Sequence, residues 1–172
     1  GFYIQYDAQI ELYNNKFAIP GLALYNAARP LLKRENKFAN HIDYVWFEIW
    51  HHEGRRARHG ASMMGPDWTQ WHGNYEVGKH FYGKYLPEIE ELIEANIESP
   101  DNDKKAAATE LKRIYDLVVN DKFEVTDVAT GEKKFSTGHL FYSGNLSEEE
   151  KARRKKDQEE FAIRYGKEQI EK

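Results

Sequence analysis

The chain of 172 residues contains no cysteine. This absence excludes a disulfide framework, an iron–sulfur centre, a thiolate zinc site and a haem attached through thioether bonds to the chain's own residues. An excess of positive charge is also lacking, because 25 lysines and arginines stand against 29 aspartates and glutamates, for a net charge of −4. Nucleic-acid-binding domains usually show a basic excess, so we expect no nucleic-acid partner.

Long hydrophobic runs are missing as well. Residues 1–15 have neither a basic leader nor a continuous apolar stretch, so we expect no signal peptide and no membrane span. What the chain has in quantity is aromatic side chains, at 14%, and charged ones, at 31%. A single domain of this length can bury a sizeable core, but this mixture suits large amphipathic surfaces. We therefore expect some of the rings to face another molecule.

The spacing of apolar residues predicts a mainly α protein, a bundle of long helices. Apolar side chains recur at steps of three and four residues, which is the helical period. Asn40 is a good N-cap, and proline at the first position of a helix is favourable. Four helical segments are expected: 3–31, kinked or broken at Pro20; 40–64, ended by Gly65 and Pro66; 66–96, kinked at Pro87; and about 100–119.

The remaining third of the chain differs in character. Residues 121–146 contain threonine, glycine and alternating apolar positions, which predict a short hairpin or an irregular excursion. Ser147 and Glu150 form a capping box, and acidic residues then precede basic ones, as the helix dipole favours. The predicted organisation is a helical lobe over 1–120, the excursion over 121–146, and a charged C-terminal helix over 147–172.

Histidine and arginine are concentrated at the end of the second helix. On a helix, steps of three, four and seven residues return to the same side, so His52, Arg56, His59 and Met63 share a face. Two histidines seven residues apart can look into one crevice. Hydrogen-bonded interior or surface histidines would give the same spacing.

Two metal motifs begin in this segment and are incomplete. His52-Glu53 would start the H-E-x-x-H motif of zinc proteases, but arginine stands at position 56. Glu48 and His51 form one Glu-x-x-His, whereas a carboxylate-bridged di-iron bundle needs a second copy and two further carboxylates. Neither motif therefore predicts a metal site.

The third helix carries an aromatic stripe. Core packing explains most such stripes, but glycines at 73, 78 and 83 each cost about 1 kcal/mol relative to alanine in a helix. They make sense where a bulky group, such as a flat macrocycle or another helix, approaches the backbone. The stripe consists of Trp68, His72, Tyr75, Lys79 and Tyr82, with Trp71, Gly78 and Gly83 beside it.

Residues 40–95, and above all "HEGRRARHGA-MMGPD-TQWHG-YE" within 48–82, resemble the cysteine-free helical C-terminal region of the hydroxylamine oxidoreductase family of multihaem c-type cytochromes, which includes octahaem nitrite reductases. The Cys-x-x-Cys-His motifs that hold the haems of that family are absent here. The resemblance implies a subunit or lobe that completes a complex interconverting hydroxylamine, nitrite or related compounds. It further implies haem c held covalently by a partner chain, a hetero-oligomer, and a periplasmic or extracellular location.

The resemblance also implies roles for particular residues. His59 is the first choice as axial ligand to a partner's haem iron, followed by His52 and His72. Arginines would neutralise propionates, or else form a solvated face, and aromatic rings would pack on macrocycle edges. Three histidines, His41, His80 and His139, are expected to be structural. The residues assigned to haem contact are His52, His59, His72, Arg55, Arg56, Arg58, Trp68, Trp71 and Tyr75.

The direction of the reaction follows from one departure. Oxidising members of the family often carry a tyrosine in the "PD-TQWHG" motif that is covalently joined to a neighbouring subunit's haem. The corresponding position here is 68 or 75, and tryptophan at 68 has no phenolic oxygen for that bond. The resemblance thus implies the reductive direction. Two alternatives stay open: a structural or electron-transfer assembly subunit without its own substrate site, and a cofactor-free helical interaction module.

Overall fold

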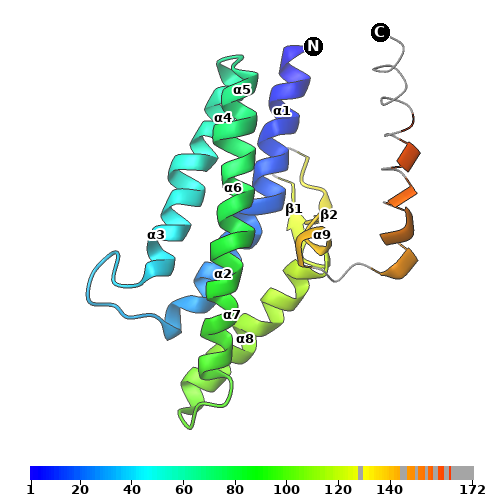
Figure 1. Ribbon diagram of the computed structural model, residues 1–172. Helices are drawn as coiled ribbons and strands as arrows, with labels where there is room; N and C mark the ends of the chain where they lie inside the picture. The colour runs from blue at the N-terminus through cyan, green and yellow to red at the C-terminus, as the bar shows by residue number, and fades with distance from the viewer. Residues whose placement is uncertain are drawn as a thin grey trace.

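The computed structural model describes residues 1–127, 130–143, 147–149, 151–153, 155–156, 159–160 and 163. Several long helices and one two-stranded sheet make up this part of the chain (Figure 1). The mainly α class predicted from the apolar spacing is confirmed, and the short hairpin falls in the predicted excursion.

The first helical segment has two α-helical pieces, but a wide π-helical turn joins them in place of a break. The Ile19 N–H bonds the carbonyl of Asn14, five residues back, and Pro20 follows at the start of the next helix. A proline ring clashes with the carbonyl four residues before it in an α-helix, and the wide turn moves that carbonyl. The elements are α1 (Phe2–Tyr13), η1 (Asn14–Ala18), α2 (Ile19–Ala28) and a 3₁₀ turn (Arg29–Leu31).

The second segment begins as predicted. Asn40 and Asp43 form a capping box, in which the Asn40 N–H donates to the Asp43 carboxylate at 3.0 Å. The helix ends just before Met64, which has a positive φ of 56°. A π-helical turn interrupts this segment too. Its elements are α3 (His41–Phe47), η3 (Glu48–Glu53) and α4 (Gly54–Ser62).

The third segment starts at Pro66, again as predicted, and contains two π-helical turns. The second turn ends two residues before Pro87, which repeats the arrangement at Pro20. A widened turn therefore ends two residues before Pro20 and two residues before Pro87. The elements are α5 (Pro66–Thr69), η4 (Gln70–Asn74), α6 (Tyr75–His80), η5 (Phe81–Tyr85) and α7 (Leu86–Asn96).

The core extends from the contact of α2 and α7 with α8 (Asn102–Val119) to buried side chains of α1, α3, η3, α4 and α6. Fully buried side chains from these helices and from η5 fill it, and the buried Tyr85 hydroxyl donates to the Gly21 carbonyl at 2.8 Å. The Asp101 side chain caps α8 by accepting hydrogen bonds from the backbone N–H groups of Asp103 and Lys104. At the other end of the molecule α1, α4 and α6 run lengthwise (Figure 1). The largest core residues include Leu24, Phe81, Tyr85, Ile89 and Leu111.

A buried histidine connects the excursion to the helices. His139 is fully buried, with Nδ1 2.9 Å from the Tyr82 hydroxyl and Nε2 2.8 Å from Ser136 Oγ, as expected of a structural histidine. Burial lowers the pKa of His139 to about 4, so the imidazole is neutral near pH 7. The Asp121 carboxylate accepts hydrogen bonds from the backbone N–H groups of Gly138 and His139, which fixes this turn.

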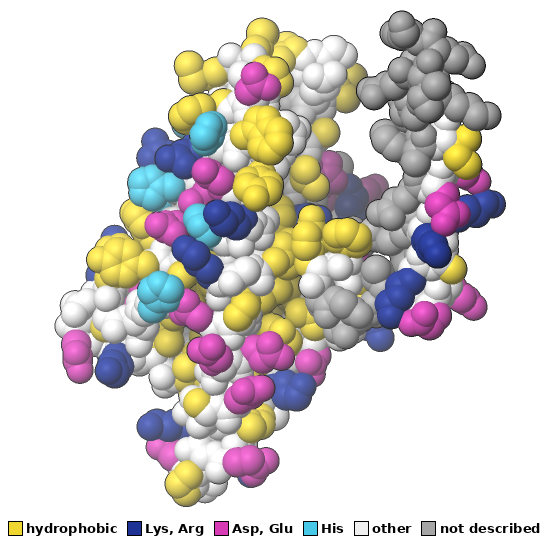
Figure 2. Space-filling view, in the orientation of Figure 1, with side chains coloured by type: hydrophobic (Ala, Val, Ile, Leu, Met, Phe, Trp, Pro, Cys, Tyr) yellow, Lys and Arg dark blue, Asp and Glu magenta, His cyan; other side chains and the backbone are white. Residues whose placement is uncertain are grey.

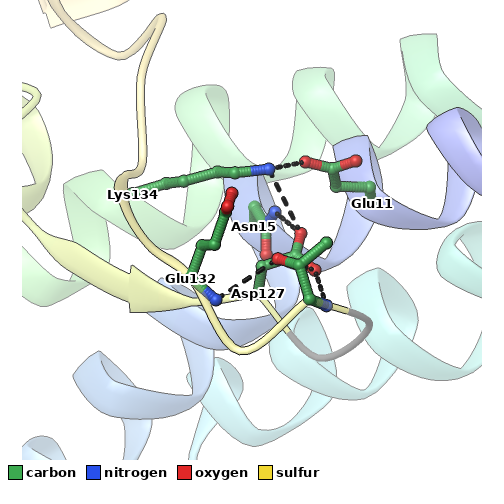
Figure 3. A network of polar contacts seen from close by, with 6 residues as sticks. Glu11, Asn15, Asp127, Glu132 and Lys134 are labelled. Carbon is green, nitrogen blue, oxygen red and sulfur yellow. Dashed lines mark hydrogen bonds and ion pairs between the residues drawn. The ribbon is translucent and has the colours of Figure 1, made fainter.

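The hairpin of β1 (Glu124–Thr126) and β2 (Lys133–Phe135) is antiparallel and docks on α1 through polar side chains (Figure 3). Lys134 Nζ lies 2.7 Å from Glu11 Oε1 and 3.6 Å from Asp127 Oδ2. Asn15 Nδ2 donates to the same Asp127 oxygen at 3.3 Å. Ion pairs and hydrogen bonds therefore hold the hairpin against the first helical segment.

The predicted capping box of the C-terminal helix lies partly outside the described residues, because Glu150 is not among them. Within them, the Lys151 N–H donates to the Ser147 carbonyl at 2.9 Å. A further helix, α9 (Leu140–Ser143), precedes this stretch. No helix in the described ranges has both the length and the apolar character needed to cross a membrane.

Candidate functional site

Two large rings of the predicted stripe and the ring of Trp71 beside it lie on the molecular surface. Trp68 is 51% exposed, Trp71 63% and Tyr75 59%, so they do not belong to the core of this chain. We call these three residues the aromatic patch. Figure 2 shows large hydrophobic side chains intermixed with histidines and basic side chains over α3, α4 and α6. Tyr82, farther along the stripe, instead packs inward against Phe17.

A polar network joins α4 to the patch. Arg56 Nη1 donates to Glu76 Oε2 at 2.9 Å, and the second oxygen of Glu76 lies 3.6 Å from His72 Nδ1. The Trp68 ring covers this pair, with its centroid 4.6 Å from that of His72 and 5.9 Å from the Arg56 guanidinium carbon. Three predicted site residues, Arg56, Trp68 and His72, thus come together. Glu76 was missed, although its spacing of four from His72 is a helical-pair signal.

The other predicted histidines are exposed on the second segment. His52 packs edge-on against Phe47, at 5.6 Å between centroids. His59 is exposed on α4, and its side chain makes no hydrogen bond, ion pair or ring contact within the described chain. Arg55 Nη1 lies 3.5 Å from His51 Nε2. Partial loss of solvent and the nearby charge of Arg55 lower the pKa of His51, which favours a neutral imidazole.

Arg58 does not join the Arg56 network. Its Nε donates to the Gly54 carbonyl at 3.1 Å, and its guanidinium carbon lies 5.1 Å from the centroid of the Tyr13 ring. Two residues along a helix turn the side chain by about 200°, so Arg56 and Arg58 point to different sides. Arg58 instead lines a groove of about 550 Å³ between the first and second segments, together with Trp50.

The three glycines of the third segment differ in their surroundings. A Cβ at Gly73 would stand 2.5 Å from the Ala57 Cα, so this glycine allows the two backbones to meet. At Gly78 and Gly83 no atom of the described chain lies within 4 Å of that position, apart from chain neighbours and the backbone of the same helix. Gly78 follows Tyr75 by three residues, so the two residues lie on the same side of the helix. The open space beside Gly78 is available to a molecule outside this chain.

A second cluster of titratable groups lies beneath the surface. One carboxylate oxygen each of Glu48 and Glu53 and a ring nitrogen of His80 lie within 4.8 Å of one another. His80 Nδ1 is 3.1 Å from Glu53 Oε1. Glu48 of the Glu-x-x-His motif thus lies with Glu53 and His80. A separation of 27 residues between Glu53 and His80 leaves no signal in the sequence.

Tyr13 of α1 lies beside this cluster. Its hydroxyl donates to the Ile49 carbonyl at 3.2 Å, and its ring occupies the space that a side chain at Gly54 would need. Burial raises the pKa of Tyr13 to about 12; the charge of Arg58 lowers it and that of Glu53 raises it. The hydroxyl is therefore protonated near neutral pH and serves as a fixed donor.

Comparison of the chain with known protein families, curated proteins and solved structures finds no match. The geometry alone therefore defines the class: a helical protein with an exposed surface of aromatic, histidine and arginine side chains, and with a partly buried carboxylate–histidine cluster.

Proposed function

We propose that this chain is a cysteine-free subunit or C-terminal lobe that completes a multihaem cytochrome c complex. The complex would interconvert hydroxylamine, nitrite or related nitrogen compounds in the reductive direction, in the periplasm or outside the cell. The proposal rests on the resemblance of residues 40–95 and on one structural observation, the exposure of the aromatic patch.

That exposure supports a docking role. Removing a large apolar side chain from water stabilises by about 1.5–3 kcal/mol, so three exposed rings favour burial in an interface. Tryptophan, tyrosine and arginine are the residue types enriched at the energetic centres of interfaces. The open space at Gly78 beside Tyr75 permits close approach of a bulky group. The patch therefore suits a flat, partly apolar partner.

The residues present fit a haem held by another chain. The exposed imidazoles of His52, His59 and His72 are available as axial ligands, since they are not enclosed by this chain. An axial imidazole needs an acceptor on its other nitrogen, and Glu76 stands beside Nδ1 of His72. This contact makes His72 as strong a candidate for the axial ligand as His59, which has no such partner among the described residues.

The chemistry of the bound haem would be electron transfer to the nitrogen compound. The chain's own contribution would be to orient that group and keep water from it. Arg56, already held by Glu76, and the exposed Arg55 would bind carboxylates of the propionate kind. Arg58, directed toward Tyr13, does not support this role.

One observation favours the alternative, an electron-transfer or structural assembly subunit without its own substrate site. Two grooves in the described chain, of about 550 and 540 Å³, are lined by other residues, in one case Trp50 and Arg58 and in the other Met64 and Thr69. The aromatic patch lines neither. Partner haems that all carry two histidine ligands would support the alternative, and one with an open axial position would support the enzyme.

Purification through a tag on this chain tests the proposal. We expect a haem-bearing chain to copurify and to give a c-type visible spectrum. Trp71→Ser with Tyr75→Ser should abolish copurification while leaving the far-UV circular dichroism unchanged. Tyr3→Ser, which alters another exposed ring, is the matched control and should retain the partner. A colourless preparation without a partner chain would contradict the proposal.

The histidines can be ranked in the same complex. Replacing the ligand should convert one low-spin haem to high-spin, so His72→Ala and His59→Ala are compared by electron paramagnetic resonance. His41→Ala, at an exposed histidine that pairs with Glu88, is the control. Unchanged spectra for both variants would remove these histidines from the ligand assignment.

A further inference from the structure

The π-helical turn η3 brings two glutamates to one side of the helix. Glu48 and Glu53 are its first and last residues, five apart, and the next N–H, of Gly54, bonds the carbonyl of Ile49 five residues back. In a regular α-helix residues five apart point about 140° away from each other. The wider turn aligns them instead, and such turns occur frequently at functional sites.

A third group reaches the same point from α6. His80 Nδ1 lies 3.1 Å from Glu53 Oε1, and the nearest polar atoms of Glu48, Glu53 and His80 are all within 4.8 Å of one another. Glu53 is only 4% exposed, whereas Glu48 and His80 are partly accessible. The cluster is therefore buried at Glu53 and accessible to solvent at Glu48 and His80.

The buried carboxylate of Glu53 lacks a hydrogen-bond partner on one of its two oxygens. Glu53 Oε2 is buried and accepts no hydrogen bond from any described residue. A buried carboxylate oxygen without a partner is costly, and a second carboxylate beside it adds like-charge repulsion. One imidazole that already serves Oε1 offsets only part of this charge. A divalent cation would satisfy the unpaired oxygen and both negative charges at once.

We propose that Glu48, Glu53 and His80 bind one divalent first-row transition cation. Two carboxylate oxygens and one imidazole nitrogen are the ligand types used for Zn²⁺ and related ions, with water completing the shell. The cation joins η3 to α6. Its role is to hold these two helical segments together, and it does not depend on the proposed partner.

Zinc titration of the full chain, after treatment with a chelator, tests the site by calorimetry. We expect one tight equivalent of Zn²⁺, apart from weaker binding at exposed histidines. Glu53→Gln keeps the side-chain shape but removes the charge, and Glu48→Gln does so at a more accessible position. Each should weaken the tight site by about tenfold or more, since outer-shell partners alone contribute roughly 10–100-fold.

His59→Gln is the matched control, because it removes an exposed histidine outside the cluster, and it should leave the tight site unchanged. Cobalt(II) in place of zinc gives a visible spectrum that should disappear in the glutamate variants. The proposal is overturned if the chain binds no tight equivalent, or if both glutamine variants, folded by circular dichroism, bind zinc as the parent does. Loss of the site in His59→Gln alone would also overturn it.

Discussion

The two sides of the α4 and α5–α6 pair are built from opposite kinds of residue. Where the segments meet, side chains are small: Gly60 lies against Thr69, and Gly73 against the Ala57 backbone. On the outer side stand the rings of Trp71 and Tyr75. The small residues let the backbones approach, so no room remains between them for large rings. The exposed rings of Trp71 and Tyr75 therefore lie outside this contact, whereas Phe81 and Tyr85, farther along the same segment, are buried in the core.

Gly73 and Gly78 show the same contrast within one helical segment. At Gly73 a Cβ would meet backbone atoms of Ala57, whereas at Gly78 the described chain leaves the space open. A glycine at the first position is needed for the fold. At the second position the fold gives no reason for glycine, which is what a docking surface would predict.

Substituting the two glycines tests this difference between Gly73 and Gly78 most directly. Gly73→Ala should destabilise by about 3 kcal/mol, because a backbone neighbour cannot move aside for the new methyl group. Gly78→Ala, the matched control, should stabilise by about 0.5–1 kcal/mol through lower entropy of the unfolded chain. Urea unfolding of the two variants measures both. Equal stabilities would show that the inner contact does not require glycine.

Histidine titration sharpens the contrast between buried and exposed sites. The pKa of His139 is about 4 in the folded chain and about 6.5 when unfolded. As the pH falls below 6.5, His139 binds a proton in the unfolded chain but not in the folded chain. The free energy of unfolding therefore decreases progressively down to pH 4.

Between pH 7 and pH 5 this loss should amount to about 2 kcal/mol. His139→Gln should flatten the dependence, measured by unfolding across this range, while His59→Gln at an exposed site should preserve it. A pH profile that is unchanged in His139→Gln would assign the loss to other groups.

The smallest expected effect concerns covalent modification of the outer face. Trp68 has no phenolic oxygen that could form a covalent bond to haem. Tyr75, the other candidate position for such a bond, is 59% exposed and lies seven residues further along the chain. In the proposed complex we expect the denatured chain to have its unmodified mass. Mass spectrometry of tryptic peptides checks this, and a peptide of this chain joined to haem would refute the reductive direction.

Local chemistry alone determined much of the fold. Asn40 as a cap, Pro66 as a helix start and the turn residues of the excursion act through hydrogen bonds to near neighbours, so the helices were predictable and a hairpin was one of two structures expected in the excursion. The shared surface of Trp68 and His72 also follows from helical spacing. The π-helical turns were not predicted, because a widened turn has no distinct residue pattern beyond the proline that follows two of them.

Only the tertiary structure decided which side of each helix is buried. Aromatic residues occur on both sides of the third segment, with Tyr85 in the core and Tyr75 at the surface, so apolar periodicity could not orient it. The packing of α1 directs Arg58 toward Tyr13, and the pairing of Glu53 with His80 links residues 27 apart. These contacts depend on which helices meet, and residues such as Gly60 and Gly73 let those helices approach closely.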